Sequence, residues 1–330
     1  MPVPTRGSLI VRLRNWVGDV TLGLPALERL AGAGYELQLV GKGWARELLA
    51  GHGWPVHVLP QRTLERVALL RRLRADARAA DRGFGQRLNA VCFPYSFSSA
   101  LEFRLAGLRA IGHVYEGRSL LLARAVPRPQ GRHELEVYWQ LASALLGAQA
   151  PLPERIGLRP APAHEDAARA LCERHGIAPG CIVICPFSGG TWSGQDKAWP
   201  GFADFAAREL PAFGRTVVVC PGPGEEALAR EQFASAVCLE GVGLGTYAAL
   251  LAQAALMISN DTGPGHIAAA VGTPLVSVLG PSDPAQWGAW GPDVRVVKGA
   301  GASGEPAAWP DPAAVRDAVA AALRAAPSAG

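Results

Sequence analysis

The sequence predicts an α/β protein built from two doubly wound parallel sheets. The chain has 330 residues, 49% of them hydrophobic, so it can bury a full core and exceeds a typical single domain. Short apolar runs alternate with amphipathic segments, the rhythm of parallel strands covered by helices on both faces. The rhythm stops at PLPERIGLRPAP (151–162), which contains four prolines, and then starts again. These observations predict two domains joined by a proline-rich linker.

The N-terminal domain is predicted to span residues 1–155. SLIVRL is typical of its first strand, and the Leu-rich segment that follows it has helical spacing. We expect strands and helices to alternate in the order strand 8–13, helix 19–33, strand 36–41, helix 44–51, strand 55–60, helix 63–81, strand 87–94 and helix 133–146.

The C-terminal domain is predicted to span residues 156–330 and to repeat the same plan. Its predicted strands are 181–186, 215–221, 236–241, 255–260 and 274–280. Its predicted helices are 164–175, 200–210, 224–233, 245–253 and 264–271. A last Ala-rich helix, 311–325, could pack back on the N-terminal domain. Two such domains facing each other would leave a cleft at the carboxyl ends of their strands, where open α/β sheets bind ligands.

Charge and cysteine content exclude little but favour a cytoplasmic protein. The 32 basic and 28 acidic residues give a net charge of +4, which permits an anionic ligand or membrane surface without demanding nucleic acid. The six cysteines form no CxxC pair, and most lie in or beside apolar runs, as reduced core thiols do. We find no signal-peptide core and no apolar run near the roughly 20 residues that span a bilayer.

The segment NDTGPGH (260–266) concentrates polar residues, glycine and proline between two apolar runs. Pro264 suits the start of a helix, and the N–H groups around it would point out of the helix toward an anion, with the helix dipole assisting. Asp261 would then accept hydrogen bonds from a sugar hydroxyl. The alternative is that Asp261 or Thr262 only caps the helix and His266 only packs in its first turn.

A similar turn follows the first strand, in NWVGDV (15–20). Asp19 could simply cap the next helix. Alternatively, it is a carboxylate at the carboxyl end of the strand that accepts a proton from a substrate. The turn has no G-x-G-x-x-G fingerprint, which argues against a dinucleotide enzyme.

Five segments carry a pattern that extends over residues 9–284. They are LIVRLRNWVGDVTLGLPALERL (9–30), FPYSFSSALEFRLAGLRAIGH (93–113), HELEVYWQLASALLG (133–147), CPFSGGTWSGQDKAWP (185–200) and NDTGPGHIAAAVGTPLVSVLGPSDP (260–284). In order and spacing they resemble glycosyltransferase family 9, the bacterial lipopolysaccharide heptosyltransferases. The segment 93–113 is similar to heptosyltransferase II proteins in particular.

The resemblance implies a GT-B architecture, with the acceptor bound by the N-terminal domain and the nucleotide sugar by the C-terminal domain. It implies an inverting, metal-independent transfer of heptose from ADP-L-glycero-D-manno-heptose to the inner core of lipopolysaccharide, without a cofactor. Asp19 matches the catalytic base, and Lys197 matches the lysine that pairs with the diphosphate. The positions expected to bind the donor are Lys197, Ser188, Thr191, Glu225, Asp261, Thr262, Gly263 and His266.

Some of these assignments stay open. The loop FSGGTWSGQD is longer in glycine and richer in tryptophan than the family pattern, so the phosphate could be contacted by Ser188 or by Thr191. Either Glu225 or Glu226 could lie near the nucleoside, although the first turn of any helix favours glutamate. Lys197 could also be an ordinary surface lysine.

Arginines on the N-terminal side suggest an anionic acceptor. Residues 62–87 contain eight arginines against three acidic residues, which indicates either a solvated helix face or a basic flank for phosphates and Kdo carboxylates. Arg62, Ser96 and Arg118 are the predicted acceptor contacts. The acceptor would be a Kdo–lipid A type inner core, with the protein associated peripherally with the inner face of the cytoplasmic membrane.

Three other functions are compatible with parts of the sequence. A GT-B enzyme could use another nucleotide sugar or a protein or capsule acceptor, because the motifs mark the scaffold better than the donor. A non-catalytic sugar-nucleotide-binding module is disfavoured, because binding alone needs neither Asp19 nor Lys197. A nucleic-acid binder is the weakest, since the clustered arginines lack interleaved aromatic residues.

Overall fold

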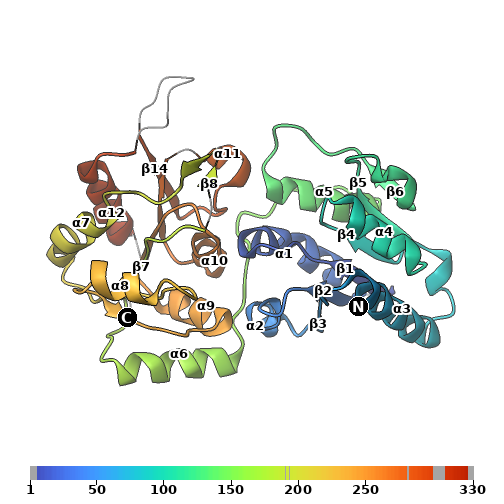
Figure 1. Ribbon diagram of the computed structural model, residues 1–330, viewed down its shortest axis with the longest axis horizontal. Coiled ribbons are helices and arrows are strands. Elements are labelled where there is room, and N and C mark those ends of the chain that lie inside the picture. The colour runs from blue at the N-terminus through green and yellow to red at the C-terminus, as the bar shows by residue number, and fades with distance from the viewer. Residues whose placement is uncertain (1–5, 190, 193, 281, 300–308, 326–330) are drawn as a thin grey trace. The chain divides into compact units, whose positions relative to one another are not determined.

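The computed structural model describes residues 6–189, 191–192, 194–280, 282–299 and 309–325. The chain divides into two compact units, Met1–Pro153 and Glu154–Gly330, with the division inside the proline-rich stretch. Each unit consists of a parallel sheet with helices on both faces (Figure 1). The predicted α/β class with two doubly wound sheets is therefore confirmed.

The N-terminal unit contains a six-stranded sheet in which every pair of neighbouring strands is parallel. In spatial order, the strands are β3 (Val56–Val58), β2 (Tyr35–Gly41), β1 (Gly7–Arg12), β4 (Ala90–Cys92), β5 (Ala110–His113) and β6 (Arg124–Val126). β1 is central and its side chains are buried on both faces from Leu9 onward, as expected for an apolar parallel strand.

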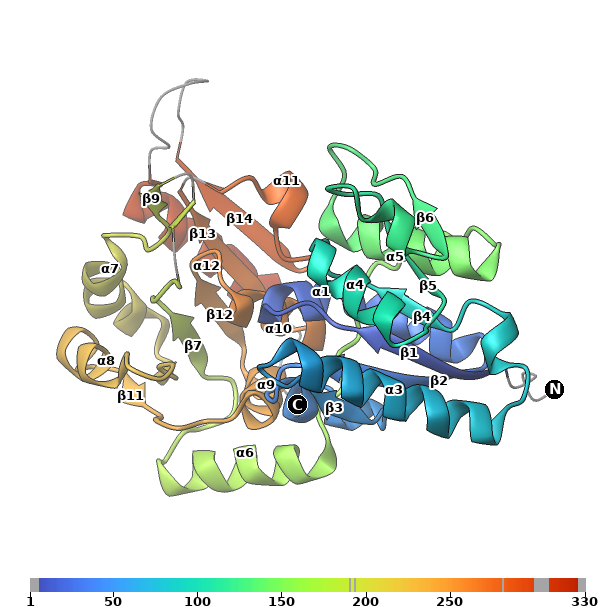
Figure 2. The same ribbon diagram turned by 45° about the vertical axis from the view of Figure 1, so that its right-hand side comes forward.

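Helices cover both faces of this sheet. Its helices are α1 (Val17–Gly32), α2 (Ala45–Leu48), α3 (Thr63–Ala80), α4 (Phe97–Leu105) and α5 (Glu134–Leu146), with short 3₁₀ turns η1 (Ala50–His52), η2 (Phe84–Gln86) and η3 (Arg118–Leu121). Helices α1 and α5 pack on each other, whereas α3 and α4 lie on the opposite face, in front of the strands in Figure 2. Ile10 joins the core on the α3–α4 face together with Leu70 and Phe103.

The C-terminal unit repeats the plan with a second parallel sheet of six strands. In spatial order, these are β11 (Val237–Cys238), β10 (Val217–Val219), β7 (Ile182–Cys185), β12 (Leu256–Ser259), β13 (Leu275–Leu279) and β14 (Val294–Lys298). Two short antiparallel strands, β8 (Thr191–Trp192) and β9 (Gln195–Asp196), form a separate ribbon in the loop after β7.

The helices of this unit are α6 (Pro162–Arg174), α7 (Phe202–Arg208), α8 (Glu226–Gln232), α9 (Leu244–Gln253), α10 (Gly263–Val271), α11 (Pro284–Trp287) and α12 (Pro312–Ala325), with the 3₁₀ turn η4 (Leu210–Phe213). The prediction that the last helix packs back on the N-terminal domain stays a prediction. The buried face of α12, with Val315 and Val319, joins the core over β12 and β13 of its own sheet, because its apolar side chains fill the space beside α7.

The two central strands are β1 and β4 in the first sheet and β7 and β12 in the second. In each sheet the chain starts at the first of these strands and adds two strands toward one edge. It then returns to the centre and adds the remaining strands toward the other edge. Doubly wound sheets bind ligands outside the carboxyl ends of their strands at such a switch point. The loops after β1 and β4, and those after β7 and β12, are therefore where functional side chains are expected.

Candidate active site

Asp19 lies at the switch point of the N-terminal sheet, two residues after the start of α1. The N-cap of this helix is Trp16, which makes no side-chain capping bond. Asp19 is thus a first-turn residue, and the alternative in which it caps the helix is not what the structure shows. A carboxylate in the first helical turn is favoured by the helix dipole.

Two partners from different elements hold Asp19, which is only 9% exposed. The hydroxyl of Tyr138, on α5, donates to Asp19 Oδ1 over 2.9 Å. The Nε of Arg14, in the loop after β1, lies 3.4 Å from the same oxygen. Both contacts fall on Oδ1, so Oδ2 receives no hydrogen bond from the residues that the structure describes. The carboxylate is therefore oriented through one oxygen, and Oδ2 is the oxygen that could accept a proton from a hydroxyl group.

The protonation states of these partners suit that role. Burial, and after it the charge of Asp19, raises the pKa of Tyr138 well above its ordinary value, so Tyr138 keeps the proton that it donates. Burial alone would lower the pKa of Arg14, but Tyr138 and Asp19 outweigh it and the pKa is raised. Arg14 therefore stays cationic beside the carboxylate.

A second cationic side chain lies close by. The guanidinium groups of Arg14 and Arg128 stack on the ring of Tyr95, at 4.5 Å and 4.9 Å from its centroid. Glu134, which is 1% exposed, accepts a hydrogen bond from the Tyr95 hydroxyl and pairs with Arg128 over 2.9 Å. The site beside Asp19 thus holds two arginines fixed by aromatic stacking. Arg128, Tyr95 and Tyr138 were not predicted as site residues.

The predicted acceptor residues have different placements. Arg62 is exposed at the N-cap of α3. Ser96 is the N-cap of α4, where its Oγ accepts a bond from the Ser99 N–H over 3.4 Å. Arg118 is completely buried and donates to the carbonyl oxygens of His113 and Pro94, so its guanidinium orders this loop. The predicted acceptor contact of Arg118 stays a prediction, and its burial is a property that sequence position alone did not reveal.

Asn260 organises the switch point of the C-terminal sheet. It directly follows β12 and is 1% exposed. Its Oδ1 accepts a bond from the Trp199 N–H over 3.1 Å, and its Nδ2 donates to Pro186 O over 2.5 Å. One side chain thus ties together the end of β12, the loop after β7 and the KAWP segment that contains Lys197.

This network brings Lys197 to Asp261. The Lys197 ammonium lies 3.4 Å from Asp261 Oδ2, and both side chains are largely buried, with exposures of 18% and 13%. Asp261 immediately precedes Thr262, the N-cap of α10. A cation and the positive end of a helix dipole therefore occupy one place, an arrangement that attracts a diphosphate.

The start of α10 is left open by its own residues. Thr262 makes no side-chain capping bond to the helix, and its hydroxyl lies 3.6 Å from Cys185 Sγ instead. Burial raises the pKa of the Cys185 thiol to about 12 despite that neighbour, so it adds no charge. Gly263 is the first helical residue, and a Cβ at Gly265 would lie 2.6 Å from Ser259 Oγ, which explains the need for glycine there.

The other residues predicted to bind the donor lie in the loop after β7, in α10 and at the start of α8. Ser188 donates to Asp196 over 3.4 Å, and His266 is buried in the first turn of α10. Thr191 begins β8, but its side chain lies outside the described part of the structure. Glu225 is the N-cap of α8 and accepts a bond from Gly222 N–H over 2.8 Å.

Glu226 accepts an equivalent bond from Gly224 N–H, also over 2.8 Å. Both carboxylates therefore fold back on their own loop, and the choice between them stays open.

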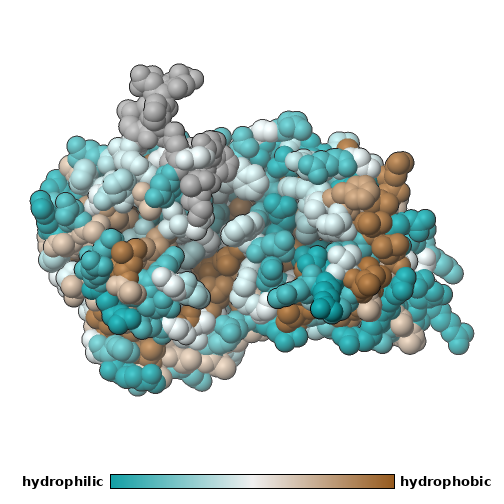
Figure 3. Space-filling model, viewed as in Figure 1, coloured by the Kyte–Doolittle hydropathy of each residue, from teal (hydrophilic) through white to brown (hydrophobic). Residues whose placement is uncertain are grey.

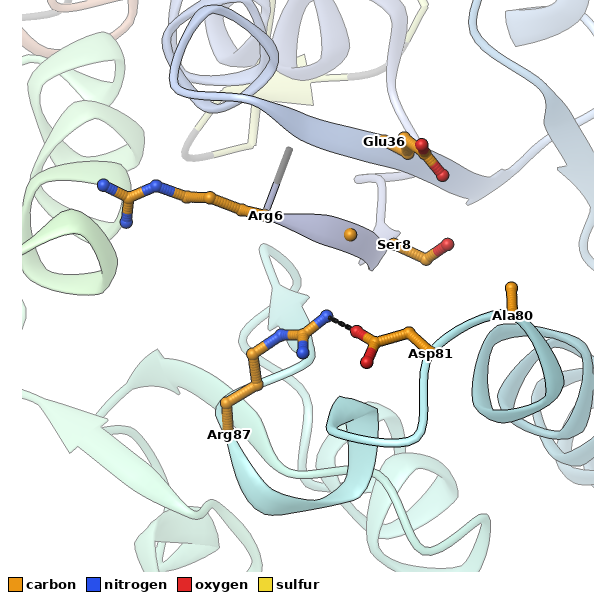
Figure 4. Close-up of a pocket in the computed structure, with 7 residues that line it drawn as sticks. Arg6, Ser8, Glu36, Ala80, Asp81 and Arg87 are labelled. Carbon is orange, nitrogen blue, oxygen red and sulfur yellow. Dashed lines mark ion pairs between the residues drawn. The ribbon is translucent and has the colours of Figure 1, made fainter. Parts of the chain in front are cut away.

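A pocket of about 440 Å³ lies at the other edge of the N-terminal sheet (Figure 4). Its wall includes the first residues of β1 and β2 and the ion pair of Arg87 and Asp81, whose Nη2 and Oδ2 atoms are 2.5 Å apart. Because doubly wound sheets bind ligands at their carboxyl edge, we assign this pocket to neither substrate.

The described residues contain no group of three or more His, Cys, Asp or Glu side chains able to hold a metal ion. None of their helices is long and apolar enough to cross a membrane.

The two sheets and the polar groups at their switch points define an α/β protein of the GT-B fold. The model of glycosyltransferase family 9 (heptosyltransferase) matches residues 88–306. The chain belongs to this family.

Similar proteins agree with the assignment. Lipopolysaccharide heptosyltransferase 1 of Pseudomonas aeruginosa is 30% identical over 173 residues, which are 51% of this chain and 45% of that protein. The chain covers less than half the length of the curated relatives that it matches. Among solved structures, ADP-heptose lps heptosyltransferase II of Escherichia coli is similar with a TM-score of 0.76 and 23% identity, covering 96% of this chain and 98% of that one.

The Escherichia coli heptosyltransferase WaaC with ADP-2-deoxy-2-fluoro heptose is similar with a TM-score of 0.65 and 23% identity, covering 89% of this chain and 94% of that one. At these identities, the solved structures show the fold alone.

Proposed function

We propose that this chain is an inverting glycosyltransferase that moves heptose from ADP-L-glycero-D-manno-heptose to the inner core of lipopolysaccharide. The observation that carries the proposal is Asp19, a carboxylate held through one oxygen at the switch point of a family 9 chain. A binding module would gain nothing from a buried carboxylate with one open oxygen, whereas a transferase needs a base at that position.

The donor is proposed to bind the C-terminal unit. Lys197 and the N–H groups at the start of α10 would neutralise the diphosphate, with Thr262 and Gly263 in contact with it. Asp261, released from Lys197 by the competing phosphate, would accept hydrogen bonds from the sugar. The presence of an ADP-heptose analogue in the similar WaaC structure supports the choice of nucleotide.

We propose the other donor contacts from the places of the residues in the C-terminal unit. His266, in the first turn of α10, would meet the sugar or phosphate edge. A hydroxyl from Ser188 or Thr191 would contact the phosphate, and Glu225 or Glu226 would lie near the nucleoside.

The chemical step is a single displacement. Asp19 Oδ2 takes the proton of the acceptor hydroxyl as its oxygen attacks the anomeric carbon, and the bond to the diphosphate breaks from the opposite side. Configuration at that carbon is therefore inverted. Negative charge develops on the departing ADP, where Lys197 and the helix N-terminus stabilise it more in the transition state than in the ground state. Because these groups supply the positive charge, we expect transfer without a metal ion or other cofactor.

The acceptor is proposed to bind beside Asp19 on the N-terminal unit. Arg14 and Arg128 both stack on the ring of Tyr95. Their two positive charges suit an acceptor rich in phosphate and carboxylate groups, such as a Kdo–lipid A inner core. Arg62 and Ser96 are exposed and remain candidates for its outer parts. A lipid-linked acceptor implies peripheral attachment to the cytoplasmic face of the inner membrane.

Thermal unfolding with ADP, UDP, GDP and TDP, each in EDTA, tests the donor. A ligand at about 100 times its dissociation constant adds roughly 2.7 kcal/mol, which gives a clear rise in Tm. We expect the rise with ADP alone. A rise with UDP, GDP or TDP instead would keep the fold but overturn the donor, and no rise with any nucleotide would argue against a transferase.

A further inference from the structure

Large hydrophobic side chains are exposed on the outer side of α4 and on the neighbouring turn η3. Phe97 and Leu105 of α4 are 46% and 49% exposed, and Leu120 of η3 is 93% exposed. Phe97, Leu101 and Leu105 are spaced four residues apart, so they form one stripe along the helix. Figure 3 shows this apolar surface on the side of the N-terminal unit where α4 and β6 lie, bordered by hydrophilic surface.

The turn that carries Leu120 is firmly attached to α4. Arg118, at the start of η3, is completely buried and donates from Nη1 to the carbonyl oxygens of Pro94 and Ser96, just before α4 begins. Its Nε also donates to His113 O over 2.9 Å. The buried guanidinium therefore holds the turn η3 against α4, and Leu120 projects from this turn.

Two exposed arginines lie at the C-terminal end of the stripe. The stretch 62–109, which includes α3 and α4, is also basic, with ten arginines and four acidic residues, whereas Glu116 is exposed just before η3. Arg104 is exposed on α4 beside Leu105, and the exposed Arg71 of α3 donates to Leu105 O over 3.1 Å. Apolar side chains flanked by arginines match the interface of an anionic bilayer, where the former enter the headgroup region and the latter meet lipid phosphates.

We propose that Phe97, Leu101, Leu105 and Leu120, with Arg71 and Arg104, form a surface that docks on an anionic lipid bilayer. This membrane-docking surface deepens the proposed function, on which it rests for a lipid-linked acceptor. It lies on the same unit as Asp19, and Tyr95, which stacks on Arg14, precedes Ser96 at the start of α4. Docking would therefore place the acceptor-binding side of this unit near the bilayer. The excess of arginine favours an anionic lipid surface over a protein partner.

Co-sedimentation with vesicles tests the proposal. The full chain is mixed with vesicles of phosphatidylcholine, or of equimolar phosphatidylcholine and phosphatidylglycerol. We expect binding to the anionic vesicles and little to the neutral ones. The double variant Phe97→Asp/Leu120→Asp should lower the partition coefficient at least about tenfold, since it loses apolar burial and adds repulsion. Arg71→Glu/Arg104→Glu should lower it about fivefold or more for each arginine.

Matched controls come from exposed positions of the C-terminal unit. Leu228→Asp, at a leucine that is 41% exposed on α8, and Arg208→Glu, at an exposed arginine of α7, should bind as the parent chain does. Unchanged thermal unfolding would show that each variant is folded, as its exposed position implies. Absence of parent binding to anionic vesicles, or equal loss in the controls, would overturn the proposal.

If the surface bound a protein and not lipid, the parent chain would not bind the anionic vesicles. That result would also contradict the proposal. Transfer to a soluble acceptor without acyl chains separates docking from catalysis. Both double variants should retain that transfer at the parent rate. If the parent chain transfers no heptose yet binds vesicles through this surface, the proposed function fails while the docking surface stands.

Discussion

Replacing Tyr138 by Phe removes one hydroxyl and tests how Asp19 is held. The hydroxyl donates to Asp19 Oδ1 over 2.9 Å, and the only other contact of that oxygen among the described residues is Arg14 at 3.4 Å. A hydrogen bond to a charged group contributes about 1.5–3 kcal/mol. If that whole contribution keeps Asp19 in its reactive orientation, its loss lowers kcat about 10- to 100-fold. The KM for the nucleotide sugar should not change, because the residues proposed to bind it belong to the C-terminal unit.

The assay is the steady-state rate of heptose transfer, with unfolding by urea as a parallel measurement. The Phe side chain keeps the ring that packs on Phe93, whose centroid is 5.0 Å away, so the fold is retained. Tyr35→Phe is the matched control, because Tyr35 begins β2 at the amino edge of the sheet. A Tyr138→Phe variant with the parent kcat but reduced stability would refute the reasoning, since the hydroxyl would then only stabilise the fold.

Three further predictions concern other parts of the chain. Lys197→Ala should raise the Kd of ADP about 10- to 100-fold in calorimetry, since a charge-assisted contact is lost. An unchanged Kd would contradict its assignment. Gly265→Ala should destabilise the chain by about 1–3 kcal/mol, because the new Cβ would lie 2.6 Å from Ser259 Oγ, and a Ser259→Ala background should restore stability. Failure of that rescue would contradict the steric explanation. Burial lowers the pKa of His113 below its ordinary 6.5, so the unfolded chain takes up the proton more readily and stability should fall as pH drops below about 6.5. Urea unfolding over this range should show a slope that His113→Gln reduces, with His57, whose pKa burial also lowers, accounting for part of the remainder, and equal slopes would exclude His113 as a source.

Most of the fold could be predicted because buried parallel strands appear in the sequence as continuous apolar runs. The strands at 8–13, 181–186, 255–260 and 274–280 all correspond to strands in the structure. The missed strands are short or mixed in character. β5 contains Gly112 and His113, and β6 has three residues before a proline. β14 mixes polar and apolar side chains and lies between loops rich in glycine.

The candidate site could be predicted only where its residues lie in the strand-to-helix turns. Asp19, Lys197 and Asp261 were found in this way, and the structure brings the last two within 3.4 Å of each other. The partners of Asp19 were not found, because Tyr138 is 119 residues away in sequence and reaches it only when α5 packs on α1. The complete burial of Arg118 was not predicted either, because a sequence motif gives no information on the burial of one arginine.

The central claim is that Asp19 takes the proton of the acceptor during heptose transfer. Asp19→Asn keeps the size and shape of the side chain but removes its basicity, so the decisive measurement is the transfer rate of this variant beside its Kd for ADP. Because a general base contributes about 10²- to 10⁴-fold, we predict a loss of that order in kcat with the Kd of ADP nearly unchanged. Transfer at the parent rate, or a loss explained entirely by weaker ADP binding, would contradict the account.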